Sequence, residues 1–215
     1  MTIRVVLIDD HQMLRDALRK LLESDPEFAV VGVAADGHAG IEVVRERRPD
    51  VVVMDLMMAG LNGVDATRRI VADLPGTRIV ALSAQSGRRW VLSALEAGAS
   101  GFVLKSDSYA ELSTAVRAVH AGRKYLCAAV AGTVVDAQLA SQTGGSAYTE
   151  LSPREREVVQ LIAEGLSSRA IANQLNLSPH TVDTHRRNAM RKLDLTSVAD
   201  LTRYAIREGL TSSDE

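Results

Sequence analysis

Four short apolar runs, each ending at a polar side chain, constrain the fold of this chain more than any other feature. The runs and the residues that follow them are 3–8 with Asp9 and Asp10, 51–54 with Asp55, 79–82 with Ser83, and 102–104 with Lys105. Apolar residues recur at helical spacing in the segments between them, 12–23, 38–47, 62–73 and 108–120. Strands that alternate with helices in this way predict a parallel α/β sheet.

The carboxyl ends of parallel strands line one crevice, so these polar side chains are expected to meet there. Two carboxylates about 4 Å apart repel by about 4 kcal/mol at an effective dielectric constant near 20, so three ionised carboxylates need a cation. Mg²⁺ is the expected ion, because it takes oxygen ligands from one or two carboxylates, waters and a phosphate. The expected chemistry is phosphoryl transfer onto Asp55, with Asp9 and Asp10 holding the metal and with Ser83 and Lys105 completing the phosphoryl site.

Each of these residues also has a purely structural interpretation. An Asp-Asp pair after a strand is often a turn or a helix cap. Lys105 alone would be a solvated surface lysine, and Ser83 alone would be a hydroxyl at a strand end. The order of the four strand ends, acidic pair, acid, hydroxyl and lysine, favours the functional interpretation.

Residues 1–121 resemble the receiver domain of a two-component response regulator. The matching segments are Ile8-Asp9-Asp10-His11, Met54-Asp55-Leu56-Met57-Met58, Gly63, Leu82-Ser83-Ala84, Gly98-Ala99 and Gly101-Phe102-Val103-Leu104-Lys105. The resemblance implies a doubly wound, flavodoxin-like α/β fold with a five-stranded parallel sheet. Ala59 departs from the family, which usually has proline there, and Phe102 replaces the more usual tyrosine.

The resemblance also implies a role for each residue of the site. Asp55 is the residue that accepts phosphate from a sensor histidine kinase. The ligands implied for Mg²⁺ are Asp9, Asp10, Asp55 and the backbone carbonyl of Met57. The residues implied to sense the phosphoryl group are Ser83, Phe102 and Lys105, of which the first two move with it.

Length and composition fit a chain that folds in water. Its 215 residues are enough for one large or two small domains, and 46% of them are hydrophobic without any apolar stretch long enough to span a bilayer. No secretory signal is apparent before the first strand pattern. The single cysteine, Cys127, cannot form an intrachain disulfide. We therefore expect a cytoplasmic protein with no membrane partner.

The alternation of strands and helices stops after the first 121 residues. Residues 122–149 are interpreted as a linker between a domain of 1–121 and a domain of 150–215. A short helix of small side chains is expected at 128–140, and the Gly- and Ser-containing run 141–148 should be flexible. Glycine and β-branched residues weaken the helical propensity, so a wholly disordered linker is the alternative.

Residues 150–215 carry clear signals for the start of helices. Ser152-Pro153-Arg154-Glu155 offers a capping serine, proline at the first helical position and a glutamate that closes a capping box, and Ser178-Pro179 repeats the signal. The helices are expected from Pro153 to Gly165, through 169–174, from Pro179 to about Lys192, and over 196–207. A tight turn after the second helix makes this an all-α, four-helix domain of the helix-turn-helix kind.

The third of these helices is expected to carry nucleic-acid contacts. At 100° per residue, its inner face holds Val182, Ala189 and Leu193, and its outer face holds His180, Thr184, Arg187 and Arg191. Such a helix fits the major groove, while Arg186 and Lys192, off the centre of the face, are expected to meet phosphates. Residues 150–215 contain 9 Lys+Arg against 10 Asp+Glu. Only the local cluster therefore favours nucleic acid, and an ordinary solvated face is the alternative.

Residues 150–208 also resemble the DNA-binding domain of the NarL/FixJ/LuxR type. The matching residues are Leu151-Ser152-Pro153-Arg154-Glu155-Arg156-Glu157-Val158, Ile171-Ala172, Leu175, Leu177-Ser178, Thr181-Val182, His185, Asn188 and Lys192-Leu193. Thr181 and Asp183 join the implied DNA-binding set, although many members have lysine at the position of Asp183. We interpret Asp183 as a brace for Arg187 through an i,i+4 ion pair.

The expected function is that of a DNA-binding transcriptional response regulator, switched by Mg²⁺-dependent phosphorylation of Asp55 by a sensor histidine kinase. Phosphorylation is expected to alter the formation of a homodimer or to free the DNA-binding domain. Two protomers would bind double-stranded DNA at half-sites about one helical turn apart, with 196–207 as a candidate dimer surface.

Enzymatic turnover is not expected beyond slow self-dephosphorylation. One alternative is a DNA-binding regulator whose receiver is idle. The other is a Mg²⁺-dependent phosphohydrolase with Asp55 as the nucleophile. Met57 argues against it, because it occupies the position where such chemistry commonly needs a second acid.

Overall fold

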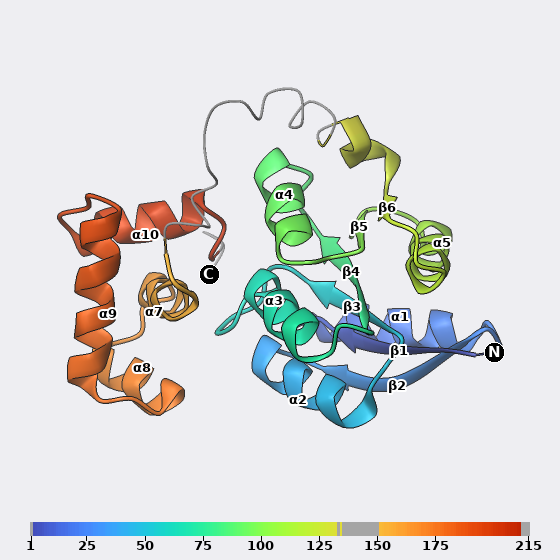
Figure 1. Cartoon of the computed structure of the whole chain (residues 1–215), viewed down its shortest axis with the longest axis horizontal. Coiled ribbons are helices and arrows are strands. Elements are labelled where there is room, and N and C mark those ends of the chain that lie inside the picture. The colour runs from blue at the N-terminus through green and yellow to red at the C-terminus, as the bar shows by residue number, and fades with distance from the viewer. Residues whose placement is uncertain (1, 133, 135–150, 212–215) are drawn as a thin grey trace. The chain divides into compact units, whose positions relative to one another are not determined.

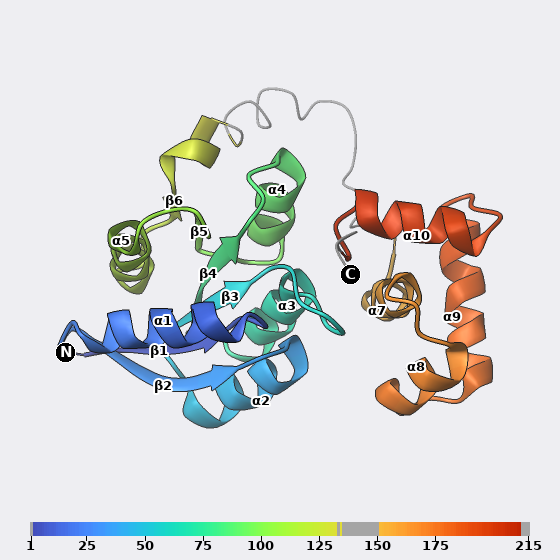
Figure 2. The same ribbon diagram turned by 180° about the vertical axis from the view of Figure 1, so that it is seen from behind.

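The computed structural model of the chain describes residues 2–132, 134 and 151–211. These residues form two compact units, one built on a parallel sheet and the other entirely helical (Figure 1, Figure 2). Each unit folds around a hydrophobic core of its own.

The first unit is a parallel sheet between two layers of helices. Its strands are β1 (Ile3–Ile8), β2 (Phe28–Ala34), β3 (Val51–Asp55), β4 (Arg78–Ser83), β5 (Gly101–Leu104) and β6 (Tyr125–Leu126), in the spatial order β2-β1-β3-β4-β5-β6. Its helices are α1 (Gln12–Glu23), α2 (Gly37–Arg47), α3 (Gly63–Asp73), α4 (Arg88–Glu96) and α5 (Tyr109–His120). Helices α1 and α5 cover one face and α2, α3 and α4 the other (Figure 1). The predicted doubly wound α/β fold is confirmed.

The core of this unit explains why its strands are almost continuously apolar. Helices cover both faces of a doubly wound sheet, so side chains of both orientations are buried. On one face, Val5, Val53 and Val80 pack with Leu22 of α1 and Val116 of α5. The strands are therefore fixed on both sides, which holds the loops at their ends in place.

Strand β6 adds a sixth strand to the five that were expected. Tyr125 pairs with Gly101 and Leu126 with Phe102, and the amide of Cys127 donates a hydrogen bond of 3.1 Å to the carbonyl of Phe102. Two residues are too few to show a strand period, which is why the sequence pattern does not reveal this strand.

The segment expected to be a linker from residue 122 onward therefore begins with a strand. Residues 128–132 and 134 are helical, in agreement with the start of the helix expected at 128–140. The remainder of that helix and the run 141–148 lie outside the described residues.

The register of the sheet brings the polar strand ends to one edge. The paired residues near this edge are Ile8 with Met54, Asp55 with Leu82, and Ser83 with Leu104. The residues that follow β1 therefore leave the sheet beside the end of β3, and those that follow β5 leave the same edge on the far side of β4.

The second unit consists of α7 (Pro153–Ala163), α8 (Ser168–Leu175), α9 (Pro179–Lys192) and α10 (Val198–Arg207). The capping box of Ser152 and Glu155 is present, and Ser178 caps α9 with proline at its first turn. Asn176 adopts a left-handed conformation that ends α8, which sets the tight turn before α9. The predicted four-helix, helix-turn-helix arrangement is confirmed.

Its core is formed by the inner faces of α7, α8 and α9, with members Val158, Leu161, Ile171, Ala172, Leu175 and Val182. On α9, Val182 and Ala189 are buried, as predicted, whereas Leu193 is half-buried at the C-cap. The opposite face of α9 is thereby left accessible. None of the described helices is long and apolar enough to cross a membrane.

Candidate metal site and candidate nucleic-acid interface

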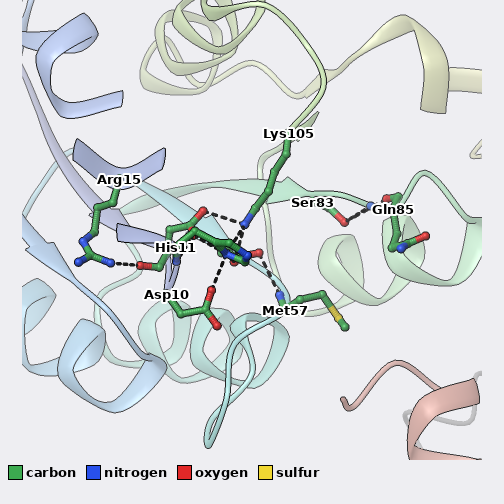
Figure 3. Close-up of polar contacts among 9 residues, drawn as sticks. Asp10, His11, Arg15, Met57, Ser83, Gln85 and Lys105 are labelled. Carbon is green, nitrogen blue, oxygen red and sulfur yellow. Dashed lines mark hydrogen bonds and ion pairs between the residues drawn. The ribbon is translucent and has the colours of Figure 1, made fainter. Parts of the chain in front are cut away.

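The carboxyl edge of the sheet holds a compact cluster of charged side chains. Asp9 and Asp10 follow β1, Asp55 ends β3, and Lys105 follows β5. The Nζ atom of Lys105 lies 2.7 Å from Asp55 Oδ2 and 2.9 Å from Asp9 Oδ2. Figure 3 shows the Lys105 side chain extending toward His11 and Asp10. The structure thus brings together the acidic pair, the lone acid and the lysine that the sequence singled out.

Asp55 is completely buried, and its environment is set by charge and by one backbone hydrogen bond. Its Oδ1 accepts a hydrogen bond of 3.1 Å from the amide of Met57. Burial raises the pKa of Asp55 to about 6, and the carboxylate of Asp9 adds to the shift, while Lys105 opposes it. Burial alone would lower the pKa of Lys105, but the two carboxylates outweigh it and raise that pKa. One ammonium therefore compensates the charge of the pocket only in part.

Gly63 lets the start of α3 pack directly on the backbone of Asp55. The amide of Gly63 donates a hydrogen bond of 3.0 Å to the carbonyl of Leu56. A Cβ atom at this position would lie 1.9 Å from the carbonyl oxygen of Asp55, a distance that backbone atoms cannot accommodate without moving. A side chain at position 63 would therefore force α3 and the backbone of Asp55 apart.

Ser83 and Phe102, the two expected switch residues, are both buried. The Ser83 hydroxyl donates a hydrogen bond of 3.0 Å to the carbonyl of Gln85 and accepts one of 3.0 Å from the Gln85 amide. Figure 3 shows this contact beside the acidic cluster. Ser83 is therefore at the predicted edge, with its hydroxyl engaged by the following loop.

His11 is the residue of this pocket to which the sequence assigned no chemical role. Its Nδ1 lies 2.7 Å from Asp10 Oδ1, 3.2 Å from Asp9 Oδ1 and 3.9 Å from Asp55 Oδ2. It also lies 3.4 Å from the Nζ atom of Lys105. The only sequence signal for this arrangement is a histidine directly after the acidic pair.

The donor set of the pocket fits a divalent cation. Ligand atoms of Asp9, Asp10, His11 and Asp55 all lie within 4.8 Å of one another. Asp9 is 2% exposed, and its Oδ2 lies 2.9 Å from the Lys105 ammonium. Carboxylate oxygens of this kind are the ligands that Mg²⁺ prefers.

The outer face of α9 is the candidate nucleic-acid interface. The expected contact residues that are exposed there are His180, Arg187, Arg191 and Lys192, and those that are half-buried are Thr181, Asp183, Thr184 and Arg186. The Nη2 atom of Arg191 donates a hydrogen bond of 3.2 Å to the Asn188 side chain, and Thr184 donates one of 2.9 Å to the carbonyl of His180. Arginine side chains thus remain accessible along this face.

The prediction of an ion pair between the Asp183 and Arg187 side chains is wrong. The Asp183 carboxylate accepts a hydrogen bond of 2.9 Å from Ser168 of α8 and lies 3.3 Å from Nη2 of Arg186. Arg187 donates instead to the backbone carbonyl of Asp183, at 3.3 Å. Spacing along α9 could not reveal that α8 presents a hydroxyl to Asp183. Asp183 therefore joins the two helices of the helix-turn-helix.

Lys192, expected to meet phosphate, has a partner within its own unit. Its Nζ lies 2.6 Å from Oε2 of Glu155, the residue that closes the capping box of α7. Burial favours the neutral form of Glu155, but Lys192 and the backbone and hydroxyl of Ser152 outweigh burial and hold the pKa of Glu155 below its usual value. The pair ties the end of α9 to the start of α7.

Two family models match the chain. A response regulator receiver domain matches residues 5–117, and the luxR family of bacterial regulatory proteins matches residues 149–205. The transcriptional regulatory protein LiaR of Bacillus subtilis is 37% identical over 98% of this chain and 100% of its own. The response regulator UvrY of Escherichia coli is 32% identical over 99% of this chain and 97% of its own.

Solved structures show the same similarity. A LuxR-family two-component response regulator from Aurantimonas sp. SI85-9A1 is 40% identical, with a TM-score of 0.62, over 65% of this chain and 99% of its own. The two-component response regulator RcsB in its complex with DNA is 28% identical, with a TM-score of 0.59, over 95% of this chain and 98% of its own.

Proposed function

The chain belongs to the two-component response regulators that join a receiver domain to a LuxR-type DNA-binding domain, and from this premise we propose that phosphorylation of Asp55 by a sensor histidine kinase controls its binding to double-stranded DNA. The observation that carries the proposal is the buried Asp55 carboxylate, 2.7 Å from Lys105 and beside Asp9. This placement suits a nucleophile whose product gains negative charge, because the ammonium is already in position.

In the proposed transfer, an Asp55 oxygen attacks the phosphorus of the kinase phosphohistidine. A P–O bond forms as the P–N bond breaks, and the histidine nitrogen leaves with the electron pair. Bound Mg²⁺, held by Asp9, Asp10, Asp55 and the Met57 carbonyl, would neutralise charge on the transferring group. The Lys105 ammonium stays with the product oxygens, since it already contacts the Asp55 carboxylate.

The proposed switch starts at Ser83. A phosphoryl group carries a charge of about −1.5 to −2 and strong acceptor oxygens, so it competes with the Gln85 carbonyl for the Ser83 hydroxyl. Loss of the contact with Gln85 would alter the loop before α4, and the buried Phe102 on β5 would move with it.

We further propose that the phosphorylated protein acts as a homodimer in the cytoplasm. Two copies of α9 would bind half-sites about one helical turn apart. Val198 and Ile206 of α10 are exposed apolar side chains, which supports the segment 196–207 as the dimer surface. Phosphate would leave Asp55 only by slow self-hydrolysis, without turnover of an outside substrate.

The proposed domain boundaries are 1–121 for the receiver, 122–149 for the linker and 150–215 for the DNA-binding domain. The contacts of β6 favour counting Tyr125 and Leu126 with the receiver sheet.

The test uses acetyl phosphate and Mg²⁺ with the full chain and with Asp55→Asn. We expect intact-mass spectrometry to detect one added phosphoryl group in the wild type only. The emission of Trp90, on α4, and the dimer fraction by light scattering should change together. A phosphorylated wild type with an unchanged dimer fraction and unchanged DNA affinity would refute the switch. No Mg²⁺-dependent difference between the two proteins would favour the idle receiver.

A further inference from the structure

Asp183 places a carboxylate on the outer face of α9, among contact residues that are basic or neutral. Its Oδ1 accepts a hydrogen bond of 2.9 Å from the Ser168 hydroxyl of α8 and lies 3.3 Å from Nη2 of Arg186. Among the residues that the structure describes, both of these contacts go to Oδ1 and none goes to Oδ2. The Asp183 side chain is 39% exposed. The carboxylate is thus held by one oxygen, and the other is available to a ligand.

The place of Asp183 on α9 is that of a residue that reads bases. In a helix-turn-helix the second helix enters the major groove with its N-terminal residues at the base edges, while the first helix crosses the backbone. Asp183 lies in the N-terminal half of α9, and Ser168 begins α8. A carboxylate that faces a phosphate is repelled by it. An acid in this position therefore favours binding only where the DNA presents a hydrogen-bond donor.

We propose that Asp183 is a specificity-determining residue that reads cytosine in the major groove through its Oδ2, an inference that rests on the DNA binding proposed above. Cytosine presents the N4 amino group there, and an aspartate can accept a hydrogen bond from it. Adenine offers a similar donor at N6, but its N7 lies beside that donor and repels a carboxylate, because N7 is an acceptor. Guanine and thymine present acceptors on the same edge. Cytosine is therefore the base that an acid at this position selects.

The contacts of Oδ1 prepare the side chain for this role. The hydrogen bond from Ser168 and the ion pair with Arg186 restrict the rotation of the Asp183 side chain before DNA arrives. A side chain that is already ordered loses less entropy on binding. The guanidinium of Arg186 also offsets part of the repulsion between the carboxylate and the phosphates that flank the groove.

Asp183→Asn separates the reading of a base from the joining of the two helices. The amide oxygen of asparagine can still accept the hydrogen bond from Ser168, so the contact between α8 and α9 is kept. The amide nitrogen adds donors, and asparagine pairs with adenine through N6 and N7. The preferred base should therefore change from cytosine to adenine. A merely structural role of Asp183 would not produce this change.

The test selects binding sites from a randomised double-stranded DNA library with the full chain, in the presence of acetyl phosphate and Mg²⁺. The proteins are the wild type, Asp183→Asn and the control Asp194→Asn, which removes the same charge from an exposed acid just beyond α9. We expect one position of the wild-type site to require cytosine, with the other bases about 5- to 150-fold weaker in competition. Asp183→Asn should select adenine at that position, and the control should match the wild type.

A second probe needs no variant of the protein. Deoxyuridine in place of the selected cytosine, with adenine opposite, exchanges the N4 donor for the O4 acceptor without adding a methyl group. The wild type should lose affinity by about 5- to 150-fold. Asp183→Asn should lose much less, because its amide can donate to O4. Wild-type affinity that is the same for both DNAs would overturn the inference even if the variant failed to fold.

Two other outcomes would also overturn it. One is an unchanged base preference in Asp183→Asn, and the other is tighter binding of this variant to all sequences alike, as expected if the acid only repels phosphates. A selective wild type with either outcome refutes the role of Asp183 alone. A wild type that selects no sequence refutes the proposed DNA-binding function, and the inference with it.

Discussion

Replacing Asp55 by asparagine is expected to stabilise the receiver domain when no divalent metal is present. The Asp55 carboxylate is fully buried, and burial together with Asp9 raises its pKa to about 6 in spite of Lys105. The unfolded chain holds the same group near its ordinary value of 3.8. Charged Asp55 therefore disfavours the folded state at neutral pH, and a neutral amide of similar volume removes that cost.

The pH dependence has a definite sign. The folded state binds the Asp55 proton more tightly than the unfolded state. Protonation of Asp55 therefore stabilises the folded wild type fully below about pH 4, and this stabilisation is lost as the pH rises through about 6. A shift of about two units, at about 1.4 kcal/mol each, gives about 3 kcal/mol. This free energy already includes the opposing effect of Lys105 on the Asp55 pKa. For a domain of this size, it corresponds to on the order of 10 °C in melting temperature.

The assay is unfolding between pH 4 and pH 8 in the presence of EDTA. Emission of Trp90, the only tryptophan, reports the receiver because Trp90 lies in α4. Asp55→Asn should be more stable than the wild type at pH 7.5, and the difference should vanish toward pH 4. Asp16→Asn, the same change at an exposed position of α1, is the control and should show no such trend. A difference that does not vary with pH, or a less stable Asp55→Asn at pH 7.5, would refute the reasoning.

Three further outcomes are expected. Gly63→Ala should lower both Mg²⁺ affinity and the receiver melting temperature, because the added Cβ would lie 1.9 Å from the Asp55 carbonyl oxygen; calorimetry that finds the wild-type affinity would contradict this. The lowered pKa of Glu155 adds stability that is present above about pH 4.5 and is lost as the pH falls. Glu155→Gln should therefore flatten the acid dependence of amide exchange in α9, and an unaltered profile would argue against the pair with Lys192. Arg187→Ala should weaken double-stranded DNA binding by about 1–3 kcal/mol at the preferred sequence, measured by competition, and an affinity equal to the wild type would exclude a base contact.

The parallel sheet could be predicted because its signals are long and repeated. Each apolar run is buried on both faces, so the strands stand out from the amphipathic helices between them. Once the strands are parallel, their carboxyl ends must meet, and the meeting of Asp9, Asp55 and Lys105 follows without any knowledge of loops. The helix starts at Ser152 and Ser178 were predictable for a similar reason, since a cap acts through residues only three positions away.

The features that escaped prediction depend on contacts between elements. β6 is recognisable only from its pairing with β5, because Tyr125 and Leu126 are too few to show a pattern. Ser168 lies on another helix, so spacing along α9 could not show that the Asp183 carboxylate would accept a hydrogen bond from Ser168 and not pair with Arg187. The position of the His11 ring depends on its rotamer, which the sequence does not fix. In each case the missing information is the direction of a side chain or the presence of a distant neighbour.

Charge balance connects the stability of the receiver with its proposed switch. Asp9, Asp10 and Asp55 bring three negative charges when ionised, and Lys105 supplies one positive charge. Mg²⁺ would bring the sum to zero, which is why its binding should stabilise the wild type and not Asp55→Asn. Phosphorylation removes the Asp55 carboxylate charge but adds a group of about −1.5 to −2, so the pocket becomes negative again. We expect that renewed excess to draw the Ser83 hydroxyl away from the Gln85 carbonyl, because Lys105 and the metal are already in place. Substitutions that alter the charge of this pocket should therefore change switching and stability together.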